Sequence, residues 1–557
     1  MRLALLFVLA LGSCKAPPAP AVPTPTPVQV CGLQPDGNRH FKILHLNDIY
    51  RIEGLADGRG GLARVRTLRA SLEQNCSAVL VTHAGDTLFP SILSRHFKGA
   101  QMIEVLNALD GETTAFDQNM IATFGNHEFD KSKLKYAPLL DARVDESQFT
   151  WLDSNIAWKE GDDGQPLISA DHLMPQRMMD LGGVKVGVFS LTIDNKIPMY
   201  VQHIDTDYVA VAATQVADLR EQGAELVIAL THLDARTDVV LLEELSGQNG
   251  PDIVLGGHDH ILMTKHVGDR AVIKGDADAL RVRVVDMWVD PEGNVGWSAS
   301  DEGEALGSQG PAYDADVKQI VDGLLATFDK QFCADEGEGC LEQQLTVAGT
   351  ELVAEELQIR RFETNLGNWI ADRMLETFEP DGVQIAFVNS GALRLNQNLA
   401  VGTPVTRQVV EEIFAYPAGM QLLEIDGATL KAVLHRSVQD WTGSGHWLQV
   451  AGVAFRHDVD GSKVADAVLL TPDGPVPLND STTYRVVTVD YLVSPEMGDQ
   501  DGYTMLSKKQ AVASERVGTD LKKVVLQALI AAGEGGIAPE VDGRICNVAR
   551  AGPCQVP

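Results

Sequence analysis

The segment Gly125-Asn126-His127-Glu128-Phe129-Asp130 (GNHEFD) follows an apolar run at residues 120–124, which is typical of a buried strand. A strand that ends in this way presents an amide, an imidazole and a carboxylate together. An amide oxygen can ligate a divalent metal, and an acid three residues after a histidine can orient its ring. Taken alone, the same six residues would also suit an ordinary strand-to-helix turn in which Asn126 is a cap.

Four other predicted strand ends carry similar chemistry. They are Asn47-Asp48, Gly85-Asp86, Thr231-His232 and Gly257-His258-Asp259-His260. Ligand sites in open α/β sheets form outside the carboxyl ends of the strands, so we expect these side chains to share one rim with Asn126 and His127. Each piece alone would suit a loop cap or a buried core histidine. Together, carboxylate, amide and imidazole favour a Zn or Mn site over a soft thiolate site.

The order of apolar runs predicts two mixed α/β domains, because 557 residues are too many for one typical core. Between residues 40 and about 300, apolar runs alternate with helical patterns. The predicted strands lie at 41–46, 78–82, 184–191, 226–230 and 253–255, and the predicted helices near 62–72 and 314–332. From about residue 341 a second domain begins, with predicted strands at 385–388 and 485–489.

The net charge of −32 argues against non-specific binding to nucleic acid, which requires a basic surface. We interpret the acidic balance as a source of solubility rather than as a sign of a particular partner. The sequence makes no prediction of oligomeric state.

The N-terminus is predicted to direct export. Arg2 precedes an apolar stretch at residues 3–11 that is too short to span a bilayer, and Leu11-Gly12-Ser13-Cys14 resembles a bacterial lipobox. This resemblance implies a signal peptide at 1–14, lipidation of Cys14 and anchoring to a membrane on the periplasmic or cell-surface side. The alternative is an ordinary signal peptide with an incidental cysteine. Residues 15–39 contain a Pro/Thr-rich tether.

The other six cysteines form an even set, as expected in an oxidising compartment. Short spacings suggest disulfides between Cys333 and Cys340 and between Cys546 and Cys554, which leaves Cys31 with Cys76. Six cysteines nevertheless allow fifteen pairings.

The calcineurin-like metallophosphoesterase pattern is the series D-x-H, GD, GNHE, H and GHxH, and the strand ends of this chain resemble it in order and spacing. The longer form GNHEFD, with a second domain behind it, resembles the secreted 5'-nucleotidases and UDP-sugar hydrolases. The resemblance implies a four-layer α/β/β/α catalytic domain at 40–340, a linker or hinge at 341–360 and a mixed α/β substrate-binding domain at 361–557.

The resemblance also implies roles for individual residues and a pair of divalent ions, with Zn or Mn expected. Asp86 would bridge the two metals, Asp48 and His260 would hold the first, and Asn126, His232 and His258 would hold the second. His127, oriented by Asp130, would contact the phosphoryl group.

One position departs from the family pattern, because Tyr50 stands where D-x-H has histidine. Tyr50 could ligate as phenolate, which favours iron, or it could stand aside and leave the first site weaker. The third interpretation is a damaged site without catalysis. Since every other ligand is present, we expect a working enzyme with an altered metal preference.

Motifs in the second domain resemble the nucleotide pocket of the family. The matching positions are Arg360, Asn389, Gly391, Arg394, Tyr416, Tyr491 and Asp501. The arginines would face phosphate, and the two tyrosines would stack on a base.

The expected activity is therefore removal of phosphate from nucleoside 5'-monophosphates or related nucleotides outside the cytoplasm. One alternative is hydrolysis of another phosphoester, such as a cyclic nucleotide or a nucleotide-sugar, on the same scaffold. Another is a non-catalytic nucleotide-binding lipoprotein with an incomplete first metal site.

Overall fold

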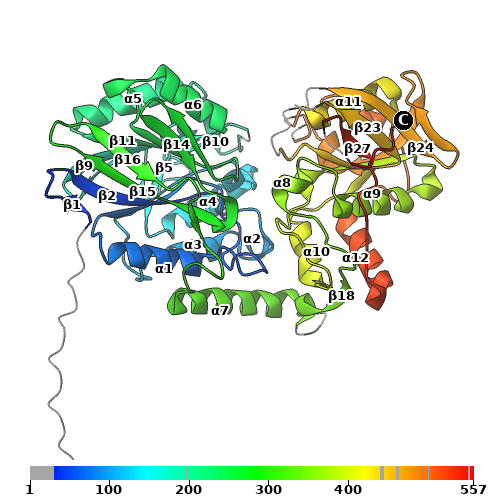
Figure 1. Ribbon diagram of the computed structural model, residues 1–557, viewed down its shortest axis with the longest axis horizontal. Helices are drawn as coiled ribbons and strands as arrows, with labels where there is room; N and C mark the ends of the chain where they lie inside the picture. Colours follow the sequence, from blue (N-terminus) through cyan, green and yellow to red (C-terminus); the bar gives the residue numbers. More distant parts are fainter. Residues whose placement is uncertain are drawn as a thin grey trace, which may run out of the picture.

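The computed structural model describes residues 30–556 apart from 196, 336, 338, 440–443, 459–462, 496, 500, 550 and 551. These residues form two lobes side by side, and α7 (Ala315–Phe332) runs along the lower side of the molecule (Figure 1). The predicted signal peptide at 1–14, Cys14 itself and the tether up to residue 29 lie outside the described residues. Among the helices that the structure describes, none has the length and apolar character needed to cross a bilayer.

The first lobe contains two large sheets. The nine-stranded sheet has the order β16 (Val295–Ala299), β15 (Arg281–Val289), β2 (Arg39–Leu46), β3 (Val79–His83), β4 (Met120–Thr123), β5 (Thr150–Leu152) and β7 (Leu173–Met174), with β1 (Gly32–Leu33) and β17 (Glu304–Ala305) paired onto it. The six-stranded sheet has the order β13 (Met263–Val267), β14 (Arg270–Lys274), β12 (Ile253–Gly256), β11 (Leu226–His232), β9 (Val184–Thr192) and β8 (Gln176–Leu181). The strands β6 (Ile156–Trp158) and β10 (Val201–Ile204) form a separate pair.

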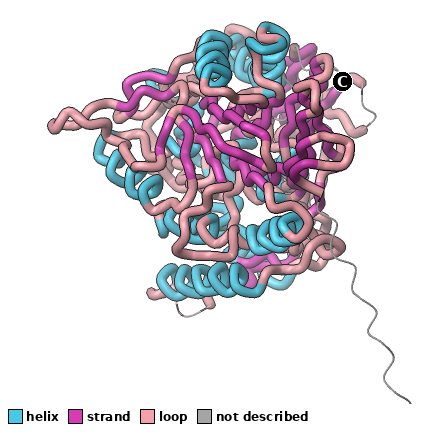
Figure 2. The backbone as a smooth tube through the Cα atoms, turned by 90° about the vertical axis from the view of Figure 1, so that its left-hand side faces the viewer, coloured by secondary structure: helices cyan, strands magenta, loops and turns pink. Residues whose placement is uncertain are grey.

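The two large sheets pack face to face and helices cover their outer faces. Ile43 and Leu80 of one sheet and Val186 and Ile228 of the other belong to one fully buried cluster. The larger sheet is covered by α1 (Leu62–Glu73), α2 (Ile92–Phe97), α3 (Ala100–Leu106), α4 (Ala137–Asp145) and α7, and the smaller by α5 (Tyr208–Glu221) and α6 (Ala235–Glu244). Figure 2 looks onto this lobe and shows strands in the middle with helices above and below. The predicted four-layer α/β/β/α sandwich is confirmed.

Local sequence explains these elements. Leu62, Val65 and Leu68 recur at helical spacing, and all three are buried on the inner face of α1. α7 begins after Asp314, whose side chain accepts hydrogen bonds from the backbone N–H groups of Asp316 and Val317. All five residues of β3 are buried because both faces of its sheet are covered, so the strand has no polar alternation.

The second lobe is also mixed α/β, as predicted. One four-stranded sheet has the order β21 (Met420–Asp426), β26 (Thr483–Val489), β19 (Ile385–Asn389) and β22 (Leu448–Ala451). The other has the order β25 (Gly474–Pro477), β24 (Val464–Thr471), β23 (Val453–His457) and β27 (Ile545–Asn547). The helices are α8 (Glu356–Ile359), α9 (Asn365–Thr377), α10 (Arg407–Ile413), α11 (Gly427–Val438) and α12 (Leu521–Ala532).

The stretch predicted as a linker, 341–360, contains regular structure. It holds β18 (Gln344–Val347), which pairs with β20 (Pro404–Thr406), and the short helix α8. A hinge in this stretch stays a prediction.

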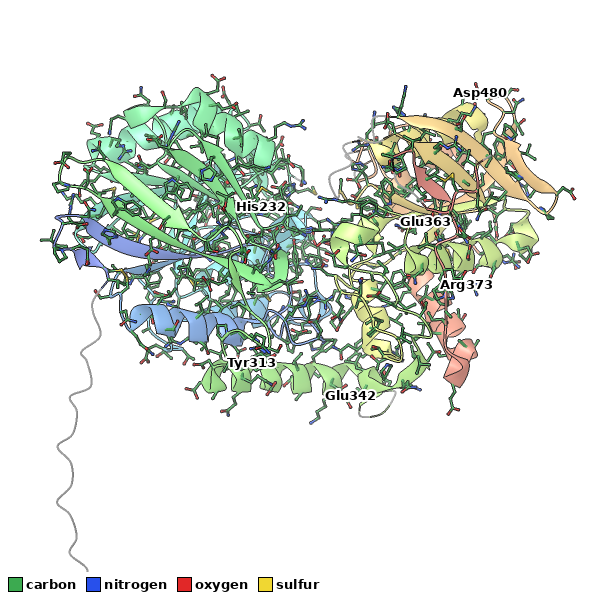
Figure 3. All side chains as sticks on the ribbon, in the orientation of Figure 1. His232, Tyr313, Glu342, Glu363, Arg373 and Asp480 are labelled. Carbon is green, nitrogen blue, oxygen red and sulfur yellow. A yellow bond between two sulfur atoms is a disulfide. The ribbon has the colours of Figure 1, made fainter. Side chains whose placement is uncertain are left out.

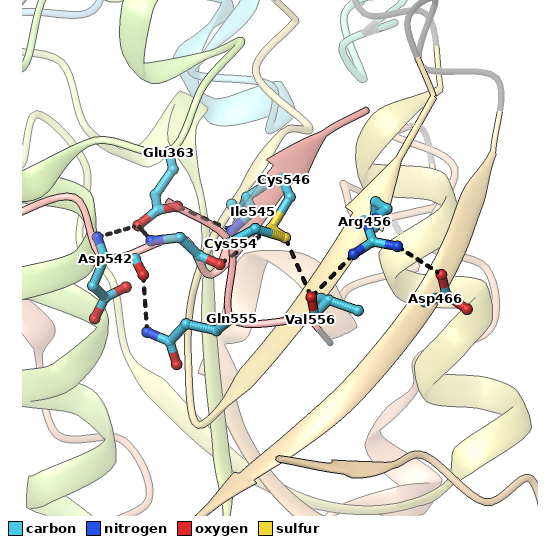
Figure 4. Close-up of a disulfide and its surroundings, with 10 residues drawn as sticks. Glu363, Arg456, Asp466, Asp542, Ile545, Cys546, Cys554, Gln555 and Val556 are labelled. Carbon is cyan, nitrogen blue, oxygen red and sulfur yellow. Dashed lines mark hydrogen bonds and ion pairs between the residues drawn. A yellow bond between two sulfur atoms is a disulfide. The ribbon is translucent and has the colours of Figure 1, made fainter. Parts of the chain in front are cut away.

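Three disulfides confirm the predicted pairing. They join Cys31 to Cys76, Cys333 to Cys340 and Cys546 to Cys554. The first ties the chain entry to the end of α1, and the last closes the C-terminal segment beside β27 (Figure 4). Such links stabilise a fold mainly by restricting the unfolded chain.

Candidate metal and substrate site

The predicted metal ligands lie at the carboxyl ends of strands from both large sheets. Asp48 follows β2, Asp86 follows β3, Asn126 follows β4, His232 ends β11, and His258 and His260 follow β12. Figure 3 labels His232 in the first lobe. Four of these residues have a left-handed backbone, with φ of 51° at Asp48, 58° at Asp86, 76° at His258 and 60° at His260. That conformation costs a non-glycine residue roughly 1–2 kcal/mol, and such strain gathers at functional sites.

Asp86, Asn126, His232 and His258 form one half of the site. Nε2 of His232 lies 3.3 Å from Oδ2 of Asp86 and 3.2 Å from Oδ1 of Asn126. The same Asn126 oxygen lies 3.1 Å from Nδ1 of His258. Because Nδ1 of His232 donates to the carbonyl of Ala84 at 2.7 Å, its Nε2 is the nitrogen presented to the other side chains.

Asp48, Tyr50 and His260 form the other half, with Asp86 between the two halves. Nε2 of His260 lies 3.2 Å from Oδ1 of Asp48 and 3.0 Å from the phenol oxygen of Tyr50. That phenol oxygen lies 3.1 Å from Oδ2 of Asp86 and 3.5 Å from Oδ1 of Asp48. Tyr50 therefore places its oxygen among the side chains predicted to hold the first metal.

The electrostatics of the cluster favour a bound cation. Burial disfavours charge on His232, yet the carboxylates of Asp86 and Asp48 raise its pKa to about 9. Burial likewise opposes charge on His260, and Glu356 and Asp48 raise its pKa to about 10. Ligand atoms of Asp48, Asp86 and His232 lie within 4.8 Å of one another. This donor set of carboxylate, amide and imidazole fits divalent metal ions such as Zn or Mn.

The predicted catalytic residues His127 and Asp130 lie beside this cluster. Nδ1 of His127 is 3.1 Å from Oδ1 of Asp130, and its Nε2 is 4.0 Å from Oδ2 of Asp86. From the second lobe, the hydroxyl of Tyr416 donates to Oδ2 of Asp130 at 2.8 Å and lies 3.1 Å from Nδ1 of His127. Tyr416, which was predicted to stack on a base, thus contacts the pair through its hydroxyl in this arrangement.

Glu128 lies in the GNHEFD segment at 125–130, and the sequence analysis assigned it no role. Its buried carboxylate accepts hydrogen bonds from four backbone N–H groups at 2.6–3.0 Å, those of Gly125, Asp86, Thr87 and Leu88. It therefore fixes the loop after β3 against the loop after β4. The only signal for this in the sequence was an acid directly before an aromatic residue in a strand-end loop.

Lys274 is a second supporting residue that sequence reasoning missed. Its fully buried Nζ donates to the carbonyls of Leu233 at 2.6 Å and Gly257 at 2.8 Å. It also pairs with the carboxylates of Asp238 at 2.7 Å and Asp259 at 2.6 Å. These bonds hold the loop that carries the two histidines after β12, and the signal was a lysine ending an apolar strand.

The predicted phosphate-facing arginines reach the same region from the second lobe. Arg394 shares a cleft with Tyr50, His260 and Glu356, and its guanidinium lies 5.7 Å from the ring centre of Tyr416. Arg360 is ion-paired with Glu356 at 2.5 Å.

The loop after β19 carries two further predicted residues. Asn389 is buried, and its Oδ1 has no hydrogen-bond partner among the residues that the structure describes. The N–H of Gly391 donates to the carbonyl of Gly445 at 2.9 Å, and a Cβ on Gly391 would stand 3.1 Å from the Cα of Gly445. Glycine therefore allows the two loops to pack closely there.

Tyr491 and Asp501 lie together, as the pocket prediction requires. Their side chains share a hydrogen bond. Burial raises the pKa of Asp501, and the nearby Arg360 and Arg394 act against that shift. The structure thus brings the predicted acid and tyrosine of the pocket near both arginines.

Glu363, which lies just before α9, supports the C-terminal segment. It accepts hydrogen bonds from the backbone N–H groups of Asp542, Gly543 and Ile545 (Figure 4). The side-chain amide of Asn368 also donates to it, at 2.7 Å. Its part in the fold is therefore to hold the strand β27.

Each of the two lobes matches a known protein family. Residues 41–262 match the calcineurin-like phosphoesterase family, and residues 345–508 match the 5'-nucleotidase C-terminal domain. The 5'-nucleotidase of Diplobatis ommata is 27% identical over 550 residues, which cover 91% of this chain and 89% of that protein.

Solved structures with the same fold include two proteins of Thermus thermophilus. The 5'-nucleotidase precursor of Thermus thermophilus has a TM-score of 0.76 at 22% identity and covers 92% of this chain and 100% of its own. The sulfate thiohydrolase SoxB of Thermus thermophilus has a TM-score of 0.67 at 16% identity and covers 92% of this chain and 97% of its own.

Proposed function

Since this chain belongs to the 5'-nucleotidase family and carries a calcineurin-like phosphoesterase domain, we propose that it removes phosphate from nucleoside 5'-monophosphates or related nucleotides. The chain is a metal-dependent phosphoester hydrolase. The observation that carries the proposed substrate is the cleft in which the metal-site residues Tyr50 and His260 face Arg394 of the second lobe.

The residues for the chemistry are those of the cluster. Asp48, Asp86 and His260 would hold one divalent ion, and Asp86, Asn126, His232 and His258 would hold the other. Bound there, the two ions supply charge that polarises a phosphoryl group. Because a carboxylate only accepts hydrogen bonds, the Nδ1 proton of His127 points to Asp130, and Nε2 faces the site beside Asp86. With both ring nitrogens protonated, His127 would donate from Nε2 to a phosphoryl oxygen there.

The second lobe would supply recognition of the nucleotide. Arg360 and Arg394 carry planar guanidinium groups that suit phosphate oxygens. The Oδ1 of Asn389, which has no partner among the described residues, can accept a hydrogen bond from a substrate hydroxyl. Tyr416 and Tyr491 offer ring faces on which different bases can stack.

Tyr50 bears on which metal is used. Its oxygen lies 3.0–3.5 Å from three proposed first-site ligand atoms, a spacing similar to the separation of neighbouring ligands around one ion. This proximity favours ligation through oxygen over a side chain that stands aside, and a phenolate ligand favours iron.

The site of action is proposed to be outside the cytoplasm, with the chain anchored to a membrane through lipidated Cys14. The three disulfides support an oxidising compartment.

Hydrolysis of another ester on the same scaffold is the second candidate, because a thiohydrolase shares the fold. Purified protein reconstituted with Mn, Zn, Co or Fe separates the two when phosphate release is measured from AMP, a cyclic nucleotide, a nucleotide-sugar and an aryl phosphate. We expect kcat/KM to be highest for AMP. Turnover of aryl phosphate without turnover of any nucleotide would overturn the nucleotidase assignment.

A further inference from the structure

His260 is held from two sides, and the two sides belong to different lobes. Its Nε2 faces Asp48 and Tyr50 in the first lobe at 3.2 and 3.0 Å. Its Nδ1 lies 2.9 and 3.0 Å from the two carboxylate oxygens of Glu356 in the second lobe. Since a carboxylate only accepts hydrogen bonds, the Nδ1 proton points to Glu356.

The side chain of Glu356 is fixed by contacts within the second lobe. It begins α8, inside the region that matches the 5'-nucleotidase C-terminal domain, and only 8% of its surface is exposed. Its charge is balanced by Arg360 at 2.5 Å, one helical turn later. Its N–H donates to the side chain of Asn396 at 3.3 Å. The carboxylate is therefore oriented from its own lobe before it meets the histidine.

The other contacts between the lobes that the structure describes reach residues beside the proposed metal ligands. Asn396 donates to Asp278 at 3.5 Å, and Tyr416 donates to Asp130 at 2.8 Å. Arg51 pairs with Glu412 at 3.2 Å and donates to the carbonyls of Arg394 and Leu395 at 3.0 and 2.9 Å. Arg95 also pairs with the second lobe, through Glu411 at 3.2 Å. The contact between Glu356 and His260, by contrast, joins the second lobe to a proposed ligand of the first metal.

We propose that Glu356 is a positioning residue that orients His260 and couples metal binding at the first site to the packing of the two lobes. The proposal rests on the assignment of His260 as a metal ligand made above. A proton held on Nδ1 leaves the Nε2 lone pair directed into the first site beside Asp48 and Tyr50, and it restricts rotation of the ring. Because the carboxylate comes from the second lobe, the first site is complete only when the lobes are packed as observed.

The coupling is reciprocal by thermodynamic linkage. If packing of the lobes strengthens metal binding at the first site, then metal at that site stabilises the packed arrangement by the same free energy.

Titration of the chelator-stripped full chain with Mn(II), following free Mn(II) by electron paramagnetic resonance, tests the proposal. We expect Glu356→Ala to weaken one of two Mn(II) sites by about 10- to 100-fold and to leave the other unchanged, as removal of a carboxylate behind a ligating histidine does. Glu356→Gln keeps an acceptor oxygen and nearly the same shape, so a loss smaller than that of the alanine variant is expected. The matched control is Glu355→Gln, because the Glu355 carboxylate accepts from N–H groups of its own helix, those of Leu357 and Gln358.

Two further measurements separate positioning from a general loss of structure. In a His260→Gln background, Glu356→Ala should cause no additional loss of Mn(II) affinity. Small-angle X-ray scattering should show a smaller radius of gyration when Mn(II) is added to the unaltered chain and no such change in Glu356→Ala.

The proposal is overturned if Glu356→Ala binds Mn(II) at both sites as the unaltered chain does. It is also overturned if the loss persists in the His260→Gln background. Both criteria depend only on Mn(II) binding. They therefore test the role of Glu356 even if the chain hydrolyses no nucleotide.

Discussion

Tyr50 places a phenol oxygen where the family pattern has an imidazole. The oxygen is buried, and it lies 3.1 Å from Asp86 and 3.0 Å from His260. Phenol is a harder ligand than imidazole and ligates best as an anion, so the replacement changes which ion is held most tightly. We therefore expect Tyr50 to affect the metal more than the nucleotide, since no proposed base-binding side chain touches it among the contacts described.

Tyr50→His should therefore change metal preference more than nucleotide affinity. We expect the ion that supports the highest kcat to shift towards Zn or Mn, with KM for AMP changed by less than about threefold. Activation curves with Mn, Zn, Co and Fe, compared at equal metal occupancy, check this. Identical metal dependence in the two proteins would remove any role for Tyr50 in the site.

Among the elements, the loops after β2, β3, β4 and β12 carry all the proposed metal ligands except His232, which ends β11. Glu128 holds the loops after β3 and β4 together. Four backbone N–H groups converge on its carboxylate, and in the described structure none of them has a strand partner to replace it. Removal of a buried acceptor leaves such donors unpaired, which is costly.

Glu128→Ala should lower the free energy of unfolding by about 2–4 kcal/mol and reduce kcat by more than about 100-fold, because the Asp86 loop is released. Urea unfolding and phosphate release measure the two effects. Glu146→Ala is the control, since Glu146 is a half-exposed glutamate paired with Arg143. A folded Glu128→Ala protein with unchanged kcat would show that the loop needs no such support.

The turn between β5 and β6 gives a prediction about pH. Burial raises the pKa of Asp153 from 3.8 to about 6, although Trp158 donates a hydrogen bond to it at 2.7 Å. A raised pKa in the folded state favours the neutral acid, so its stabilisation is full below about pH 4 and is lost as pH rises through 6. Above that pH the charged group costs roughly 3 kcal/mol.

Asp153→Asn removes this titration while keeping an acceptor for Trp158. The stability of the variant relative to the unaltered chain should therefore rise by roughly 3 kcal/mol between pH 4 and pH 7. Urea unfolding of both proteins over that pH range measures the difference. A difference that is constant with pH would show that the acid is ionised at its usual pKa in the folded protein.

The strand ends were predictable from sequence because each motif is local and follows a buried apolar run. Strand alternation places His45 on the opposite face from Asp48, and its ring contacts Thr82 and the carbonyl of Gly256. Lys274 and Glu356 were not predictable, because their partners lie in distant segments and no short pattern records such contacts.

The two lobes of the molecule meet at the proposed metal and substrate site. Arg51 with Glu412 and Tyr416 with Asp130 join them beside the proposed metals, and each of these four side chains is largely buried. A nucleotide that enters this cleft would contact metal ligands from one lobe and ring faces from the other. The packing of the lobes is therefore part of the proposed site and not only a feature of the fold.

Anomalous diffraction at the manganese edge, from crystals grown with Mn(II) and a slowly hydrolysed AMP analogue, would locate the metals and the nucleotide directly. We expect two anomalous peaks, one among Asp48, Asp86 and His260 and the other among Asp86, Asn126, His232 and His258. The phosphate should lie against both peaks, with the base beside Tyr416 and Tyr491. Manganese bound elsewhere, or an analogue bound with no metal at these residues, would contradict the account.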